Sequence, residues 1–143
     1  MLLDGENVTN LLRAEEVGNM ASASSVNPDV RKKLVELQQK LAARENVVMD
    51  GRDIGTFVLP NAELKIYLTA SVDTRADRRY KELVEKHMPA DLEEIKRDIE
   101  TRDYQDMHRE IAPLTQAEDA YYLDSSALTI DEVVAEIIRR IPQ

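Results

Sequence analysis

Cysteine is absent from the sequence, which excludes disulfide bonds, thiolate metal sites and a cysteine nucleophile. Histidine is nearly absent. His87 and His108 lie far apart in the chain and are too few for a histidine-based metal cluster. We interpret both as surface residues rather than general bases, and we expect no metal ligands among the side chains of this chain.

Long hydrophobic runs are also missing. No apolar stretch approaches the ~18 residues of a membrane span, and Asp4 follows Met-Leu-Leu at once, so the first residues do not resemble a signal peptide. With 28 acidic and 19 basic residues the net charge is −9, which argues against a basic nucleic-acid-binding surface. We expect a cytoplasmic protein without nucleic-acid or membrane partners, in which local arginines would meet any phosphate-bearing ligand.

The composition is otherwise typical of a soluble globular domain. Hydrophobic residues make up 43% and charged residues 33% of the 143 residues, enough for one domain with a core. Asp4-Gly5 predicts a small hairpin, and Asn27-Pro28 predicts a helix start with Asn27 as the cap. Further helix starts are predicted at Ser71, at Asp91 with Glu94, and at Thr129 with Glu132.

Strands and helices are expected to alternate. Apolar runs predict buried strands over residues 46–50, 63–71 and 120–126, and Leu64, Ile66 and Leu68 of the second run are expected to point inward. The predicted apolar helix faces are Val30, Leu34, Leu37 and Leu41 in one helix, and Val133, Val134, Ile137, Ile138 and Ile141 in the last. This alternation predicts an α/β fold, a parallel sheet covered by helices. Three strands are few for such a sheet.

A short polar segment, Asp50-Gly51-Arg52-Asp53, follows the first predicted strand. Ligands of open parallel sheets bind beyond the carboxyl ends of the strands, which is where these residues would lie. Arg52 offers a planar fork suited to a phosphate, while Asp50 and Asp53 can accept hydrogen bonds from amines, from ribose hydroxyls or from that arginine. The alternative is a strand-end turn with an internal Asp–Arg pair.

Two further arginine groups lie on predicted helices. Arg102, Asp106 and Arg109 have i, i+4 and i+7 spacing and would share one face. Arg75, Arg78 and Arg79 concentrate three cations in about one and a half turns, which suggests an anion. For each group the alternative is a solvated, salt-bridged surface, balanced in the second case by Asp73, Asp77 and Glu82.

Ser22 and Arg31 do not stand out alone. Taken jointly, arginines and carboxylates spread over several elements of a parallel sheet describe a nucleotide phosphate site better than scattered salt bridges do. Phosphoryl transfer needs cations that hold phosphates and neutralise charge, and little covalent help.

The stretch "VVMDGRDIGTFVLPNAELKIYLTAS", followed by "TRADRRY", "TRDYQDMHREIAPLTQAEDAYYLDSS" and "LTIDEVV", strongly resembles bacterial cytidylate kinase, the (d)CMP kinase family. The upstream stretch "LDGENVTNLLRAEEVGNMASASSVNPDVRKKLVELQQ" matches the same pattern. The resemblance covers essentially all 143 residues, and the "DGRDIGT" block and the block from Arg102 to Leu114 are its most specific parts.

This resemblance implies a P-loop kinase fold of the nucleoside monophosphate kinase type and transfer of the γ-phosphate of ATP to CMP or dCMP with Mg²⁺. It implies that residues 1–45 belong to the CMP-binding region and its connecting helix, and residues 46–143 to the C-terminal kinase core with a short lid around 75–110. The implied CMP-site residues are Ser22, Arg31, Asp50, Arg52, Asp53, Arg102 and Asp106. The implied ATP and lid residues are Arg75, Arg78 and Arg109, and the implied catalytic residues are Arg109, Arg102 and Asp53.

The chain departs from the family in one respect. None of its four glycines is followed by lysine, so it has no Gly-x-x-x-x-Gly-Lys-Ser/Thr phosphate loop, and the fold is expected to be incomplete, without the P-loop strand and helix. Three readings remain open: a truncated kinase with little or no activity alone, half of a kinase completed by another chain or another copy, and a non-catalytic CMP-binding module. An exposed sheet edge would favour self-association.

Overall fold

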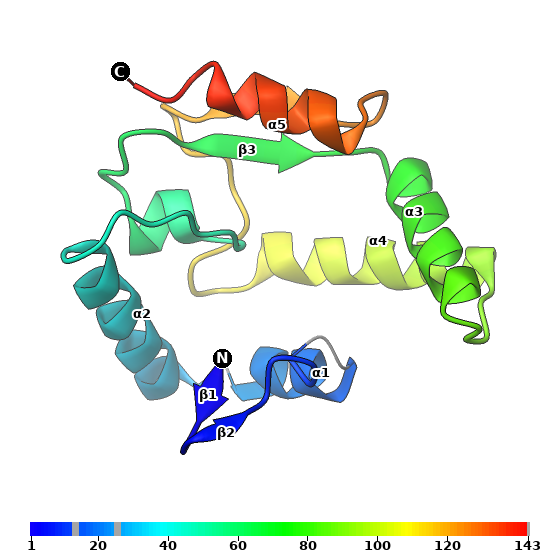
Figure 1. Cartoon of the computed structure of the whole chain (residues 1–143), viewed down its shortest axis with the longest axis horizontal. Coiled ribbons are helices and arrows are strands. Elements are labelled where there is room, and N and C mark those ends of the chain that lie inside the picture. Colours follow the sequence, from blue (N-terminus) through cyan, green and yellow to red (C-terminus); the bar gives the residue numbers. More distant parts are fainter. Residues whose placement is uncertain (13–14, 25–26, 143) are drawn as a thin grey trace. The chain divides into compact units, whose positions relative to one another are not determined.

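The structure is a computed structural model that describes residues 1–12, 15–24 and 27–142 (Figure 1). The chain divides into two compact units, Met1–Val48 and Met49–Gln143.

The first unit begins with the predicted hairpin. Strands β1 (Leu2–Leu3) and β2 (Glu6–Asn7) pair antiparallel, with Leu3 opposite Glu6. Asp4 has φ 50° and Gly5 has φ 88°, and positive φ at both central residues is what a two-residue turn of type I′ requires. The hairpin is therefore confirmed, and it is followed by α1 (Glu15–Ser24), for which the sequence predicted no element.

Helix α2 (Pro28–Ala42) starts as predicted. The side-chain oxygen of Asn27 accepts hydrogen bonds from the backbone N–H groups of Asp29 (2.9 Å) and Val30 (3.3 Å), and proline occupies the first helical position. The predicted apolar stripe is present, but its side chains are exposed: Val30, Leu34, Leu37 and Leu41.

The prediction of a strand over residues 46–50 is wrong. These residues are described, but none of them lies in a strand, and Val48 is fully exposed. A strand exists only where its backbone finds hydrogen-bonding partners, and no described segment of the chain pairs with this one. The apolar run alone could not reveal that.

The second unit contains a parallel pair of strands. β3 (Ile66–Thr69) and β4 (Tyr121–Asp124) run side by side in the register Leu68 opposite Leu123. Tyr67 and Tyr122 stack across the pair with ring centroids 5.9 Å apart. The other elements are η1 (Ile54–Val58), a single π-helical turn, and the helices α3 (Val72–Glu85), α4 (Leu92–His108) and α5 (Ile130–Ile138). The parallel pair and its helices confirm the α/β class.

The helix starts of this unit are those that the sequence predicted. The side chain of Ser71 caps α3 and that of Asp91 caps α4. At α5 the reciprocal box is complete: the Thr129 N–H donates to the Glu132 carboxylate (2.8 Å), and the Glu132 N–H donates to Thr129 Oγ1 (3.3 Å). Helices α3 and α4 pack against each other, as Figure 1 shows in green and yellow-green.

The buried core of the described residues is small. Its apolar members are Val58, Ala70, Ala76 and Leu123. Four residues that were expected to be buried are exposed instead. Leu68 was expected to point inward and is 55% exposed, and Val134, Ile138 and Ile141 on the expected buried side of α5 are exposed as well. The parallel sheet has two described strands, β3 and β4. Two strands cover too little area to bury both the alternate residues of β3 and the whole apolar face of α5.

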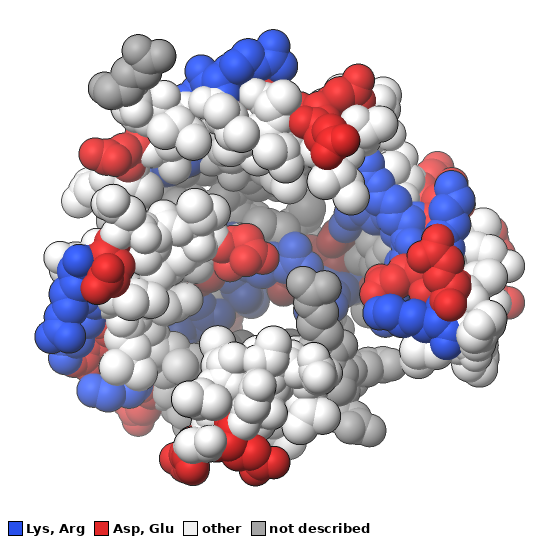
Figure 2. Space-filling view, in the orientation of Figure 1, with Lys and Arg blue, Asp and Glu red and all other residues white. Residues whose placement is uncertain are grey.

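Charged side chains of both signs are interspersed over α3, where Figure 2 shows red and blue atoms mixed. Glu82 illustrates the pattern, since it pairs with Arg79 at 2.9 Å and with Lys86 at 2.6 Å. Such exposed pairs are solvated and add little stability.

Candidate functional site

Two arginines and two aspartates meet where the residue 50–53 turn approaches the end of α4, and we call them the Arg–Asp cluster: Arg52, Asp53, Asp106 and Arg109. Arg52 Nε lies 2.8 Å from Asp106 Oδ2. The Arg109 guanidinium lies 3.9 Å from Asp53 Oδ1 and 3.9 Å from Asp106 Oδ1. The sequence pattern had placed these residues in two separate motifs, and the fold brings them together.

The end of α4 positions Arg109. The helix stops at His108, so Arg109 is its cap residue with extended backbone and does not continue the helical face that carries Asp106. The following segment folds back: Leu114 N–H donates to the Asp106 carbonyl at 2.8 Å, and Arg109 Nε donates to the Ala112 carbonyl at 2.6 Å. Ala112 has φ 49°, a left-handed conformation that costs a non-glycine residue energy. The turn fixes the guanidinium beside the two carboxylates.

The cluster retains unused hydrogen-bonding capacity. Among the described residues, Asp106 Oδ2 and Arg109 Nη2 are buried atoms without a hydrogen-bond partner. Arg52 Nε is close enough to Asp106 Oδ2 for an ion pair, but its N–H bond does not point at that oxygen. Buried polar atoms are nearly always satisfied in folded proteins, so each unsatisfied one calls for a ligand, a water molecule or a rearrangement. Both atoms belong to the same cluster.

Arg75 is committed to a different partner. Its Nη1 and Nη2 donate to the two oxygens of Asp103 at 3.0 and 2.6 Å, and its Nε donates to the Ala70 carbonyl at 3.0 Å. The hydrogen bonds to Asp103 raise the pKa of Arg75 above its ordinary value. This geometry ties the end of β3 and the first turn of α3 to the middle of α4.

Arg78 holds the loop between β4 and α5. It donates to Ser125 Oγ (3.2 Å), to the Ser125 carbonyl (2.7 Å) and to the Leu128 carbonyl (3.3 Å). Ser125 is buried and its hydroxyl donates to the Thr69 carbonyl at 2.9 Å, so the loop is fastened to the carboxyl end of β3 as well. Arg78 therefore lies at the strand end where ligands of parallel sheets bind.

The comparisons with known proteins agree on one family. The family model described as cytidylate kinase matches residues 1–143. The chain belongs to the cytidylate kinase family. It is similar to the cytidylate kinases of Streptococcus pneumoniae strains Hungary19A-6, G54 (serotype 19F) and D39 (serotype 2), with 58% identity to each over 130 residues. These residues are 91% of this chain and 58% of each relative's length, so the chain matches little more than half of the cytidylate kinases it resembles.

The remaining predicted site residues lie outside the Arg–Asp cluster. Asp50 is exposed in its turn, and Arg102 is exposed on α4, one helical turn before Asp106. Arg31 is half-buried in the first turn of α2, in the first unit. Ser22 belongs to α1, and its side chain lies outside the described residues. The structure thus groups four of the predicted positions and fastens Arg75 and Arg78 to other partners.

Within residues 1–12, 15–24 and 27–142, no group of three or more histidine, aspartate or glutamate side chains could hold a metal ion. In the same part of the chain, no helix has both the length and the apolar character needed to cross a membrane.

Sequence reasoning missed the partners of the arginines. Asp103 and Ser125 carry no motif of their own, and they lie 28 and 47 residues from the arginines they bind. Lys65 was also missed, although a charged residue at the start of an apolar strand was a signal that its ammonium needs a partner.

Proposed function

We propose that this chain supplies the acceptor side of a cytidylate kinase, binding CMP or dCMP for transfer of the γ-phosphate of ATP, with CDP or dCDP as product. The observation that supports the proposal is the Arg–Asp cluster with its two unsatisfied buried atoms, in a chain of this family. A phosphate group would satisfy Arg109 Nη2, and an amine or hydroxyl of the nucleotide would satisfy Asp106 Oδ2.

Each cluster residue has a proposed part. Arg52 and Arg109 bind the CMP phosphate, and Arg109 also neutralises charge on the transferred group. Its two ion pairs at 3.9 Å are long, so a phosphate oxygen competes with them easily. Asp53 and Asp106 orient these guanidinium groups and accept hydrogen bonds from the base or the sugar. The acceptor is the phosphate of CMP itself, so no side-chain nucleophile is needed.

Five further residues complete the proposed nucleotide contacts. Arg102, one turn from Asp106, extends the cluster toward CMP, and Asp50 shapes the same turn as Arg52. Ser22 and Arg31 are proposed CMP ligands from the first unit. Arg78, at the strand end, is the proposed ATP-side residue of the lid, whereas Arg75 would have to leave Asp103 to contact ATP.

Mg²⁺ chemistry would be supplied with ATP. The described residues do not fit a magnesium site of their own: the cluster carboxylates face arginines, and no group of three metal-binding side chains occurs among these residues. The phosphate-binding loop that would hold ATP is likewise absent from the sequence. We propose that residues 1–143 alone bind CMP but transfer phosphate poorly or not at all, and that a phosphate-binding loop from outside these residues completes the kinase.

Calorimetric titration of the chain with CMP, dCMP and UMP tests the acceptor site. CMP binding that weakens about tenfold in Asp106→Asn supports the cluster, since asparagine cannot pair with two guanidinium groups. The matched control is Asp98→Asn, an exposed aspartate two turns earlier on α4, which should bind CMP as the unmodified chain does. Flat traces at millimolar nucleotide would reject the site.

A coupled assay of ADP release from ATP and CMP separates the remaining readings. The chain is assayed alone and with the segment of the Streptococcus pneumoniae cytidylate kinase that it does not match. Turnover only in the mixture supports a kinase completed by another chain. CMP binding without turnover in either case supports a non-catalytic CMP-binding module.

A further inference from the structure

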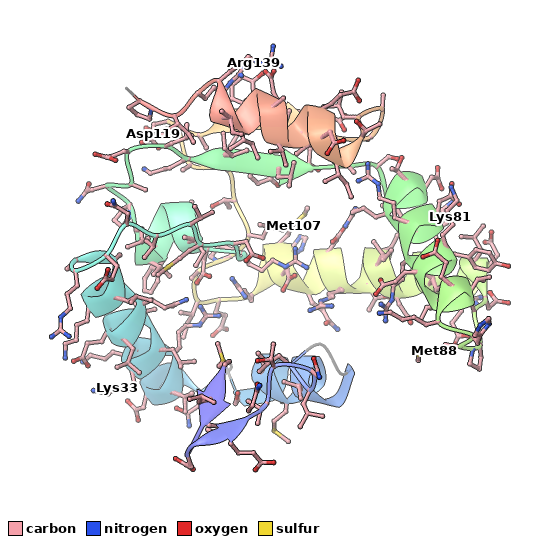
Figure 3. The ribbon with its side chains drawn as sticks, in the orientation of Figure 1. Lys33, Lys81, Met88, Met107, Asp119 and Arg139 are labelled. Atoms are coloured by element: carbon pink, nitrogen blue, oxygen red, sulfur yellow. The ribbon has the colours of Figure 1, made fainter. Side chains whose placement is uncertain are left out.

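Lys65 has an unusually enclosed side chain for a lysine. Only 8% of it is exposed, at the entrance to β3. Its ammonium donates to both carboxylate oxygens of Asp119, at 2.8 and 2.7 Å, and to the Pro60 carbonyl. Figure 3 shows the labelled Asp119 beside the start of β3. A buried ammonium is costly unless its donors are satisfied, so these partners fix the position of the side chain.

The aliphatic part of Lys65 lies against the backbone of η1. A Cβ atom built on Gly55 would lie 3.4 Å from Lys65 Cδ and 3.6 Å from Cγ. Pro60, whose carbonyl accepts from the ammonium, follows η1 by two residues. Lys65 therefore contacts this turn both inside it and just beyond its end, while its own carbonyl accepts from Tyr121 N–H at 2.9 Å, next to β4.

The π-helical turn η1, which Lys65 contacts, begins directly after Asp53 of the Arg–Asp cluster. The Asp53 carbonyl accepts from the N–H groups of Phe57 (2.9 Å) and Val58 (3.1 Å), and the Ile54 carbonyl accepts from Leu59 N–H (2.7 Å). Isolated π-turns are rare and occur mostly at functional sites. Because its carbonyl is the first acceptor of the turn, the backbone position of Asp53 depends on η1 keeping this form.

We propose that Lys65 and Asp119 are positioning residues that hold η1 and thereby place Asp53 and Arg52 for the acceptor nucleotide. The role in nucleotide placement rests on the proposed function; the role in holding η1 does not. An ion pair with a carboxylate that is 65% exposed would ordinarily contribute little. Here the cation is the enclosed partner, so loss of Asp119 leaves its ammonium with fewer acceptors in a place that water reaches poorly.

Amide hydrogen exchange of the full chain, without any ligand, tests whether Lys65 and Asp119 hold η1. In Lys65→Met and in the milder Asp119→Asn, the N–H groups of Phe57, Val58 and Leu59 should exchange at least about tenfold faster, whereas those of α3 should be unchanged. Asp119→Glu should restore slow exchange. The control, Lys86→Met, makes the same chemical change in an exposed pair with Glu82 and should have no effect on η1. Unchanged η1 exchange in Asp119→Asn, or equal acceleration throughout the second unit, overturns the proposal.

CMP titration of the same variants tests the consequence for the site. Dissociation constants at least about fivefold higher in Lys65→Met and Asp119→Asn, and restored in Asp119→Glu, support positioning of the acceptor site. If η1 exchanges faster while the CMP affinity stays within twofold of that of the unmodified chain, the proposal that η1 positions Asp53 and Arg52 for the nucleotide is overturned. If the unmodified chain binds no CMP, the proposed function and nucleotide placement both fail, and the exchange experiment alone decides whether Lys65 and Asp119 hold η1.

Discussion

Arg75 and Asp103 form a two-pronged ion pair, with Nη1–Oδ1 at 3.0 Å and Nη2–Oδ2 at 2.6 Å, that joins the first turn of α3 to the middle of α4. Paired hydrogen bonds of this kind constrain geometry as well as adding energy. Since α4 also carries Asp106, the pair helps to fix the position of the helix that contributes this residue to the Arg–Asp cluster.

Removal of either partner should destabilise the second unit. We expect Arg75→Gln and Asp103→Asn each to lower the free energy of unfolding by about 1–2 kcal/mol, a range discounted for the partial exposure of Arg75. Urea denaturation of the two single variants and the double variant measures the coupling. Additive effects would show that the pair is not a unit, and Arg79→Gln, in an exposed pair, is the control.

Arg109→Lys tests whether the guanidinium fork is needed. Lysine keeps the charge but cannot donate to the Ala112 carbonyl and to a phosphate in the same planar arrangement. We expect the dissociation constant for CMP to rise about tenfold, with little change in the unfolding midpoint. Arg139→Lys, at the C-cap of α5, is the matched control. Equal CMP affinity in both variants would remove Arg109 from the site.

The capping box of α5 predicts a pH dependence. Hydrogen bonds from the Thr129 N–H and hydroxyl lower the pKa of Glu132 below its ordinary value of 4.5. A lowered folded-state pKa means that this stabilisation is complete above the unfolded value and is lost as pH falls through the lower folded value. Glu132→Gln should therefore reduce thermal stability at pH 7, and the difference should shrink as the pH falls below 4.5 and through the lowered folded-state value. A difference that persists unchanged at low pH would contradict it.

Gly51 is expected to resist substitution because of Ile54. A Cβ atom at residue 51 would lie 2.9 Å from Ile54 Cγ1 and 3.2 Å from Cδ1, so Ile54 must shift. Gly51→Ala should cost about 1–2 kcal/mol of stability. The cost should be smaller in an Ile54→Ala background, which removes the clashing atoms, and chemical denaturation of the four proteins measures this. Equal costs in both backgrounds would exclude the clash.

The exposed apolar residues predict association of the isolated chain. Leu68 lies on a strand that pairs with β4 on one side only among the described residues, which leaves a sheet edge open. We expect sedimentation to depend on concentration, and Leu68→Lys to shift the chain toward the monomer. A monomeric chain with a cooperative unfolding transition of ordinary stability would contradict this expectation.

Local chemistry was predictable from the sequence, and long-range pairing was not. The caps at Asn27, Ser71 and Thr129 depend on residues within one helical turn, so their positions followed directly from the sequence. The strand expected over residues 46–50 and the inward side of Leu68 depended on what lies across the backbone from them, which an apolar pattern does not contain.

The same distinction holds for the candidate site. The turn around Arg52 and the spacing from Asp106 to Arg109 were recognisable as charged motifs, and their meeting depended on the path of the chain between them. Arg75 shows the limit most clearly, since its carboxylate partner, Asp103, lies 28 residues away in the sequence.

The stacked rings of Tyr67 and Tyr122 give the parallel pair of strands an optical signal of its own. The chain has no tryptophan, so tyrosine transitions dominate its near-ultraviolet circular dichroism. Rings 5.9 Å apart couple their transitions, and this coupling ends when the strands separate. Separation of β3 from β4 can therefore be followed in the near ultraviolet while the melting of the helices is followed in the far ultraviolet. The order in which the two parts of the α/β structure come apart is open to direct measurement without any added label.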